Sequence, residues 1–174
     1  ETIVHDGILF DKTKIDKNLT LFLYPDDSDE AGRRLRIYQQ YLMVSAGAQL
    51  ILEESVARGC KLHDLADYAA IQINDTHPAL VIPELMRIFM DEAGMNWDEA
   101  WDITCRTLSY TNHTVMSEAL ERWNVDLFRE QLPRVYSICQ EINRRLIEHL
   151  CAVYPNDWGK INYMAIIGDN QVRM

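Results

Sequence analysis

A carboxylate, a hydroxyl and an imidazole stand next to one another in one short polar segment, at Asp75, Thr76 and His77. Together with His113 farther along the chain, Asp75 and His77 would offer one oxygen and two nitrogen ligands to a metal ion such as zinc. A structural interpretation is also open. An Asp or Thr ahead of a proline-started helix commonly caps that helix, and a histidine beside it completes a hydrogen-bond network.

The residues around this polar segment predict a short strand that ends abruptly. Residues 69–73 are apolar and rich in β-branched side chains, as in a buried strand. Asn74 and the residues after it favour turns and helix caps. Pro78 suits the first position of the following helix, and Pro83 also belongs in a first turn. Because open α/β sheets bind ligands where strands end, this turn is a candidate binding site.

A second segment, residues 108–115, has the same character, with a short strand pattern followed by a polar turn that contains His113. About 30 residues of helical pattern separate the two strands. A connection of that length allows a crossover that makes the strands parallel. We therefore expect Asp75, His77 and His113 to meet at one edge of a small sheet.

The rest of the chain has mainly helical periodicity. A long helix is predicted over 30–57, after an acidic loop at 26–29 that is rich in capping residues. A second long amphipathic helix is predicted to begin at Pro133 and to end before Tyr154-Pro155. The predicted fold is a single domain over residues 1–174, of the α/β class, predominantly helical, with a few short, mainly parallel strands.

Composition excludes several classes of protein. The 174 residues carry a net charge of −10, which disfavours nucleic acid and anionic membranes as partners. The sequence has no apolar run long enough to cross a bilayer, and its first residues do not read as a signal peptide. The four cysteines form no CxxC pair. They read as the reduced thiols of a cytoplasmic protein, although two disulfides are also open.

Several motifs resemble the glycogen/starch (α-glucan) phosphorylase family. They occur in the family's order and cover Leu19 to Met174, whereas residues 1–18 match poorly. The motifs are LYPDDS at 23–28, NDTHP at 74–78, IPELMR at 82–87, YTNHTV at 110–115, EALERW at 118–123 and the closing GDNQVRM.

The resemblance implies part of the N-terminal half of a two-domain, GT-B-like glycosyltransferase. Such enzymes transfer a glucosyl unit from an α-1,4-glucan to orthophosphate and form glucose 1-phosphate with retention, using the phosphate group of pyridoxal 5′-phosphate. Asp75 and His77 would line the pocket at the anomeric side of the glucosyl unit. His113 would be the catalytic residue, holding a sugar hydroxyl while its carbonyl faces the anomeric carbon. Asp27 and Ser28 would belong to a mobile gate loop, where the family often has Asn in place of Ser28.

The resemblance also implies that the chain is an internal fragment of the catalytic polypeptide. The family's cofactor lysine lies downstream, so we expect this fragment to be inactive and to bind no pyridoxal phosphate. We expect no metal ion at Asp75, His77 and His113 either, because nothing in the sequence supplies a second shell around them. It should self-associate through strand edges near Ile71 and Tyr110 and through apolar helix faces such as Leu35–Tyr38–Leu42 and Ile138–Ile142–Leu146. The alternative is a stand-alone carbohydrate-binding or interaction domain without catalysis.

Overall fold

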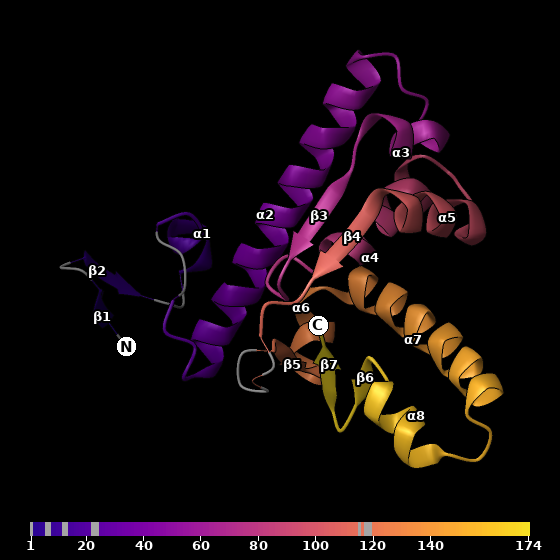
Figure 1. Ribbon diagram of the computed structural model, residues 1–174. Coiled ribbons are helices and arrows are strands. Elements are labelled where there is room, and N and C mark those ends of the chain that lie inside the picture. The colour runs from indigo at the N-terminus through magenta and orange to yellow at the C-terminus, as the bar shows by residue number, and fades with distance from the viewer. Residues whose placement is uncertain (1, 6–7, 12–13, 22–24, 115, 117–119) are drawn as a thin grey trace.

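The computed structural model describes residues 2–5, 8–11, 14–21, 25–114, 116 and 120–174 (Figure 1). Motif residues 23–24, 115 and 118–119 lie outside this description. The helical elements are α1 (Ile15–Asn18), α2 (Glu30–Ala57), η1 (Leu62–Asp64), α3 (Leu65–Tyr68), α4 (Val81–Arg87), η2 (Ile88–Glu92), α5 (Trp97–Thr107), α6 (Val125–Gln131), α7 (Pro133–Val153) and α8 (Trp158–Met164). The strands are β1 (Thr2–His5), β2 (Ile8–Asp11), β3 (Ile71–Asn74), β4 (Leu108–Thr111), β5 (Arg122–Asn124), β6 (Ile167–Gly168) and β7 (Gln171–Arg173).

Helix α4 lies at the centre of the fold and packs against α2, α5 and α7 (Figure 1). It is short, and its Val81, Leu85 and Met86 are buried. The π-helical turn η2 extends it and buries Phe89 completely. A helix that is apolar on nearly all sides belongs in the interior of a protein. Helices α2, α5 and α7 therefore pack around α4.

One charged side chain, Glu84, is fully buried on α4. Its carboxylate accepts hydrogen bonds from Tyr41 (2.8 Å) and Ser45 (2.7 Å) on α2, and from two nitrogens of Arg87 (both 2.9 Å). Burial acts to raise the pKa of Glu84, but these hydrogen bonds outweigh burial and hold the pKa below its usual value. The carboxylate thus joins α2 to α4 as a charged group with its acceptors satisfied.

The predicted helices are confirmed in several details. Helix α2 spans Glu30–Ala57 as expected, and the Asp29 carboxylate caps it by accepting from the Gly32 N–H at 2.8 Å. Gly59 follows its end with a φ of +93°, which glycine adopts without strain. Helix α7 begins at Pro133 and ends at Val153. None of the described helices is both long and apolar enough to span a bilayer.

The start of α4 differs from the expectation at Pro78. Residues 77–80 form a turn, and the regular helix begins at Val81 with Pro83 in its first turn. Because Pro83 has no N–H, it cannot donate to the Ala79 carbonyl. That carbonyl accepts instead from the Ile82 N–H at 3.1 Å, in a tighter turn.

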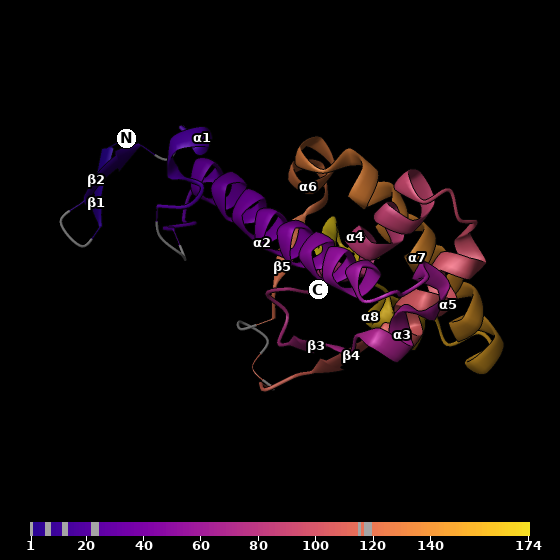
Figure 2. The same cartoon turned by 90° about the horizontal axis from the view of Figure 1, so that it is seen from above.

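The prediction of mainly parallel strands is wrong for the described part of the chain. Only β3 and β4 pair in parallel, while the pairs β1–β2, β5–β7 and β6–β7 are antiparallel. The strands within β1–β2 and within β6–β7 are separated by only two residues, and so short a connection permits only an antiparallel hairpin. The β1–β2 hairpin lies beyond the N-terminal end of α2, away from β3 and β4 (Figures 1 and 2).

Two glycines of α2 allow a matched test of how the 26–29 loop packs on this helix. A Cβ at Gly32 would collide with the backbone carbonyl oxygen of Asp26, whereas a Cβ at Gly47 would meet open space. We expect Gly32→Ala to lower the free energy of unfolding by about 1–3 kcal/mol through overpacking. Gly47→Ala should raise it by about 0.5–1 kcal/mol, because alanine favours the helix. Denaturant unfolding measures both changes, and equal shifts in the two variants would contradict the close packing of this loop.

Candidate functional site

The two polar turns follow neighbouring parallel strands, as predicted. The register runs from Ile71 opposite Leu108 to Asn74 opposite Thr111, so both strands end at the same edge. The pairing extends one step into the turn, where the Asp75 N–H donates to the Thr111 carbonyl at 2.8 Å. The crossover through α4 and α5 thereby brings segments almost 40 residues apart to one place (Figure 1).

The turn after β3 has an unusual backbone conformation at Asp75. Its φ of +68° lies in the left-handed region, which costs non-glycine residues free energy and persists only where neighbours hold it. The Asp75 carboxylate accepts from the Thr76 N–H at 2.8 Å and so contributes to holding it. The next side chain, Thr76, is only 1% exposed. The turn is therefore anchored on the side that faces the core.

A polar cavity of about 630 Å³ opens beside this turn. Its volume lies within the roughly 300–1,000 Å³ that is usual for small-molecule sites. Asp27, Asp75 and His77 line it, so three of the five predicted site residues meet there. The cavity wall also includes three arginines and one glutamate, namely Arg33, Arg36, Arg122 and Glu121. Three guanidinium groups thus balance three carboxylates around one opening.

An ion pair between Arg36 and Glu121 is the least exposed charged contact of the cavity wall. The Arg36 Nε and Nη2 donate to the two Glu121 carboxylate oxygens at 2.8 and 3.2 Å. The two side chains are 15% and 10% exposed. The second Glu121 oxygen lies 3.9 Å from the Nε2 of His77, and Arg36 also lies 3.7 Å from the Asp27 carboxylate.

The loop before α2 is tied to the helix by Arg33. The Arg33 Nη1 donates to the main-chain carbonyls of Asp27 (3.3 Å) and Ser28 (3.0 Å). The Ser28 N–H donates to the Asp26 carboxylate at 3.1 Å. The Ser28 side chain is exposed and does not line the polar cavity, so the loop directs Asp27 and not Ser28 toward it.

His113 lies at the predicted edge but outside the wall of the polar cavity. Its imidazole is exposed, and its Nε2 makes a short contact with the Asn74 side-chain oxygen. On β4, burial and the nearby Asp75 carboxylate raise the pKa of Tyr110. The two turns therefore interact, although His113 and Asp75 face different surroundings.

Asp75, His77 and His113 do not form a metal-binding set. Within the described ranges, no three His, Cys, Asp or Glu side chains are grouped so that they could hold a metal ion. The lysines give no cofactor site in the cavity either, since none of the described lysines lines it. Lys160 lies on α8, 3.6 Å from the Asp157 carboxylate and 4.4 Å from the centroid of the Tyr154 ring.

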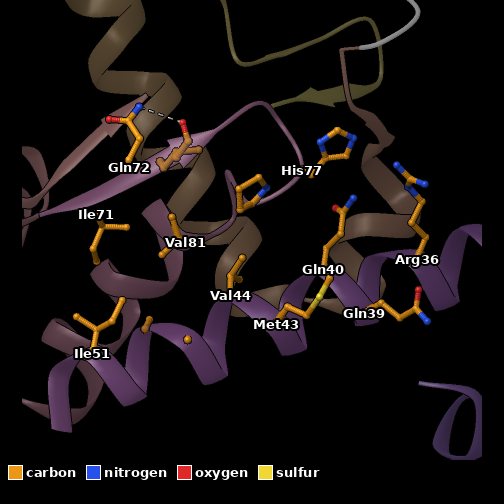
Figure 3. A pocket seen from close by; sticks show the side chains of 14 residues that line it. Arg36, Gln39, Gln40, Met43, Val44, Ile51, Ile71, Gln72, His77 and Val81 are labelled. Atoms are coloured by element: carbon orange, nitrogen blue, oxygen red, sulfur yellow. Dashed lines mark hydrogen bonds between the residues drawn. The ribbon is translucent and has the colours of Figure 1, made fainter. Parts of the chain in front are cut away.

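A second, apolar cavity of about 350 Å³ lies between α2 and β3 (Figure 3). Met43, Val44 and Ile51 of α2 face Ile71 across it. His77 lines both cavities, as does Arg36, so these two side chains form the boundary between polar and apolar surfaces.

Sequence reasoning assigned no role to Glu121 or Arg122, although both lie in the EALERW motif that carried part of the resemblance. A usable signal was present. The motif lies outside the predicted long helices, and distinctive charged residues in connecting segments more often serve function than packing.

The comparison with known proteins decides the family. A family model described as carbohydrate phosphorylase matches residues 7–174. The chain belongs to the carbohydrate phosphorylase family. The match begins inside the stretch 1–18, which the motifs had matched poorly.

Curated phosphorylases are similar to the chain over most of its length. The maltodextrin phosphorylase of Streptococcus pneumoniae is 55% identical over 145 residues, which cover 83% of this chain and 19% of the relative. The glycogen phosphorylase of Bacillus subtilis is 45% identical over 170 residues, covering 98% and 21%. The muscle form from Homo sapiens is 43% identical over 165 residues, covering 90% and 20%. The chain thus spans about a fifth of the length of these relatives.

Proposed function

We propose that residues 1–174 form one domain that supplies the glucan side of an α-glucan phosphorylase active site. On this proposal the parent polypeptide is longer, and this chain is part of the N-terminal half of its GT-B-like fold. The parent transfers a glucosyl unit from an α-1,4-glucan to orthophosphate and yields glucose 1-phosphate. A cytoplasmic location is part of the same proposal, on the ground that all four cysteines are free thiols.

The observation that carries this proposal is the balanced polar cavity at the carboxyl ends of two parallel strands. Its three carboxylates accept hydrogen bonds and its three guanidinium groups donate them, while the formal charges cancel. A neutral polyol such as a glucosyl unit, which offers both donors and acceptors, matches such a wall better than an ion does. The edge of a parallel sheet is also the usual ligand position in α/β folds.

Within this site we assign roles to the side chains of the chain itself. Asp75 and His77 bind the glucosyl unit, and the Asp75 carboxylate favours the positive charge that develops on the sugar ring in the transition state. His113 is the catalytic residue that holds a sugar hydroxyl. Because His113 lies outside the cavity wall, bound sugar must extend from the cavity toward β4 to reach it. Asp27 contributes from the gate loop, with Ser28 beside it at the mouth.

The cofactor belongs to the parent in this proposal. Since no described lysine lines the cavity, the described residues there do not fit a pyridoxal phosphate site, and the parent would hold the cofactor through other segments. The chain by itself should therefore bind no pyridoxal phosphate and release no glucose 1-phosphate from glycogen and phosphate. Cofactor absorbance and a coupled glucose 1-phosphate assay test this. Phosphorolysis by the purified chain would refute the division of the site. Binding of maltooligosaccharide by an inactive protein with no longer parent would favour the stand-alone domain.

His113→Ala in the parent tests the catalytic assignment. We expect kcat to fall at least about tenfold with little change in thermal stability, because the variant removes a transition-state contact from an exposed position. His149→Ala is the matched control, since His149 is an exposed histidine on α7 outside the cavity wall. Equal kinetics for His113→Ala, His149→Ala and the unmodified parent would make His113 a structural residue only.

Self-association of the isolated chain is the last part of the proposal. Among the described strands, β3 pairs only with β4, so its other edge is available beside the apolar cavity. Of the helix faces expected to be exposed, Leu35 and Ile138 are buried within the chain, whereas Leu42 is 38% exposed and Tyr38, Ile142 and Leu146 are half-buried. Further exposed apolar side chains of α2 are Met43 (51%) and Leu50 (55%).

Sedimentation velocity at micromolar concentration and physiological salt checks this expectation. The net charge of −10 opposes association, but salt screens it beyond about 8 Å. We expect dimers or larger species, and Met43→Glu should shift the distribution toward monomer. Met116→Glu is the control, since Met116 is 56% exposed and does not line the apolar cavity. A monomeric unmodified chain would show that the chain covers its own apolar surface.

A further inference from the structure

A row of charged and polar side chains crosses the polar cavity and joins three segments that are far apart in the sequence. It runs from Asp27 in the loop to Arg36 on α2 (3.7 Å), then to Glu121 through two hydrogen bonds of 2.8 and 3.2 Å. From Glu121 it continues to the imidazole of His77 at 3.9 Å. Both Arg36 and His77 also lie at one end of the apolar cavity (Figure 3). The row therefore connects the loop at the mouth to the turn that binds sugar in the proposed function.

Glu121 contacts this turn through its main chain as well. Its N–H donates to the Thr76 hydroxyl at 3.3 Å, and its carbonyl accepts from the Met174 N–H at 3.0 Å. Glu121 thus contacts both Thr76 and His77 of the turn, and is itself held by Met174, the residue after β7. The position next to Thr76 is Asp75, whose left-handed backbone needs external support.

The low exposure of the Arg36–Glu121 pair indicates a role other than stabilising the fold. Removing two charges from water costs free energy that a buried ion pair only partly recovers, so such a pair is weak evidence for a stabilising role. Its bidentate geometry nevertheless restricts both side chains to one arrangement. A site that must hold reacting groups within a fraction of an ångström gains from such a restriction.

We propose that Glu121 is a positioning residue of the sugar site. Paired with Arg36, it holds the turn at 75–77 and the loop at Asp27 in their sugar-binding arrangement. It acts through Thr76, His77 and Arg36 and does not itself take part in the reaction. The inference rests on the proposed function for what the turn binds, but its structural content concerns the turn alone.

Hydrogen exchange on the 174-residue chain tests the structural content without any sugar. Glu121→Gln removes the charge and keeps the size of the side chain. We expect the Asp75 amide, which is bonded to the Thr111 carbonyl, to exchange about tenfold faster, because local opening of the turn becomes easier. Amides in the buried part of α7 should exchange as in the unmodified chain.

Glu130→Gln provides a matched control. Glu130 lies on α6 and makes two hydrogen bonds, of 3.0 and 3.1 Å, with Arg34 of α2, the helix that also carries Arg36. It lies outside the polar cavity and is 61% exposed. This variant should leave the Asp75 amide unchanged. An unchanged Asp75 amide in Glu121→Gln would overturn the inference. Faster exchange throughout α7 would do so as well, because it would show global destabilisation.

Kinetics of the parent enzyme supply a second readout. Glu121→Gln should lower kcat on the order of tenfold with a smaller change in KM, since a loosened turn loses contacts made in the transition state. Arg36→Lys keeps the charge but not the paired hydrogen bonds, and should fall between Glu121→Gln and the unmodified parent. Unchanged kcat in Glu121→Gln would overturn the positioning role. An inactive unmodified parent would overturn the proposed function while the exchange result still decides the present inference.

Discussion

The burial of helix α4 is the constraint on which the rest of the structure depends. A short apolar helix surrounded by α2, α5 and α7 cannot shift without opening the core. Its buried carboxylate, Glu84, is satisfied by groups from α2 and from Arg87. The core therefore sets the position of α2 relative to α4, and with it the spacing between the two sides of the polar cavity.

The packing of this core determines the geometry of the candidate site. The turn at 75–77 lies between β3, whose Ile73 is buried, and α4, so both of its ends are held. Such support is what allows Asp75 to keep a left-handed backbone. On the other wall, Arg36 is fixed by its place on the long helix α2. The Arg36–Glu121 pair then links the two walls, with one partner on each.

The chain presents one polar surface and one apolar surface side by side. The balanced charges of the polar cavity suit a neutral, hydrogen-bonding ligand. The apolar cavity between α2 and β3 offers mostly aliphatic side chains (Figure 3). The two surfaces share His77 and Arg36. Relatives about five times as long as this chain have ample additional polypeptide, which in the proposed function supplies the rest of the glucan site.

The sequence by itself determined the elements that depend on local chemistry. Capping residues and prolines placed the ends of α2 and α7, and the long connection between β3 and β4 made those strands parallel. It also brought Asp75 and His77 to the candidate site and, through its motifs, indicated the family. Only the tertiary structure decided that Glu121 faces Arg36, that His113 and Ser28 stay outside the cavity wall, and that β5 pairs with the distant β7. These features depend on contacts between residues that are distant in sequence, and periodicity and capping carry information about near neighbours alone.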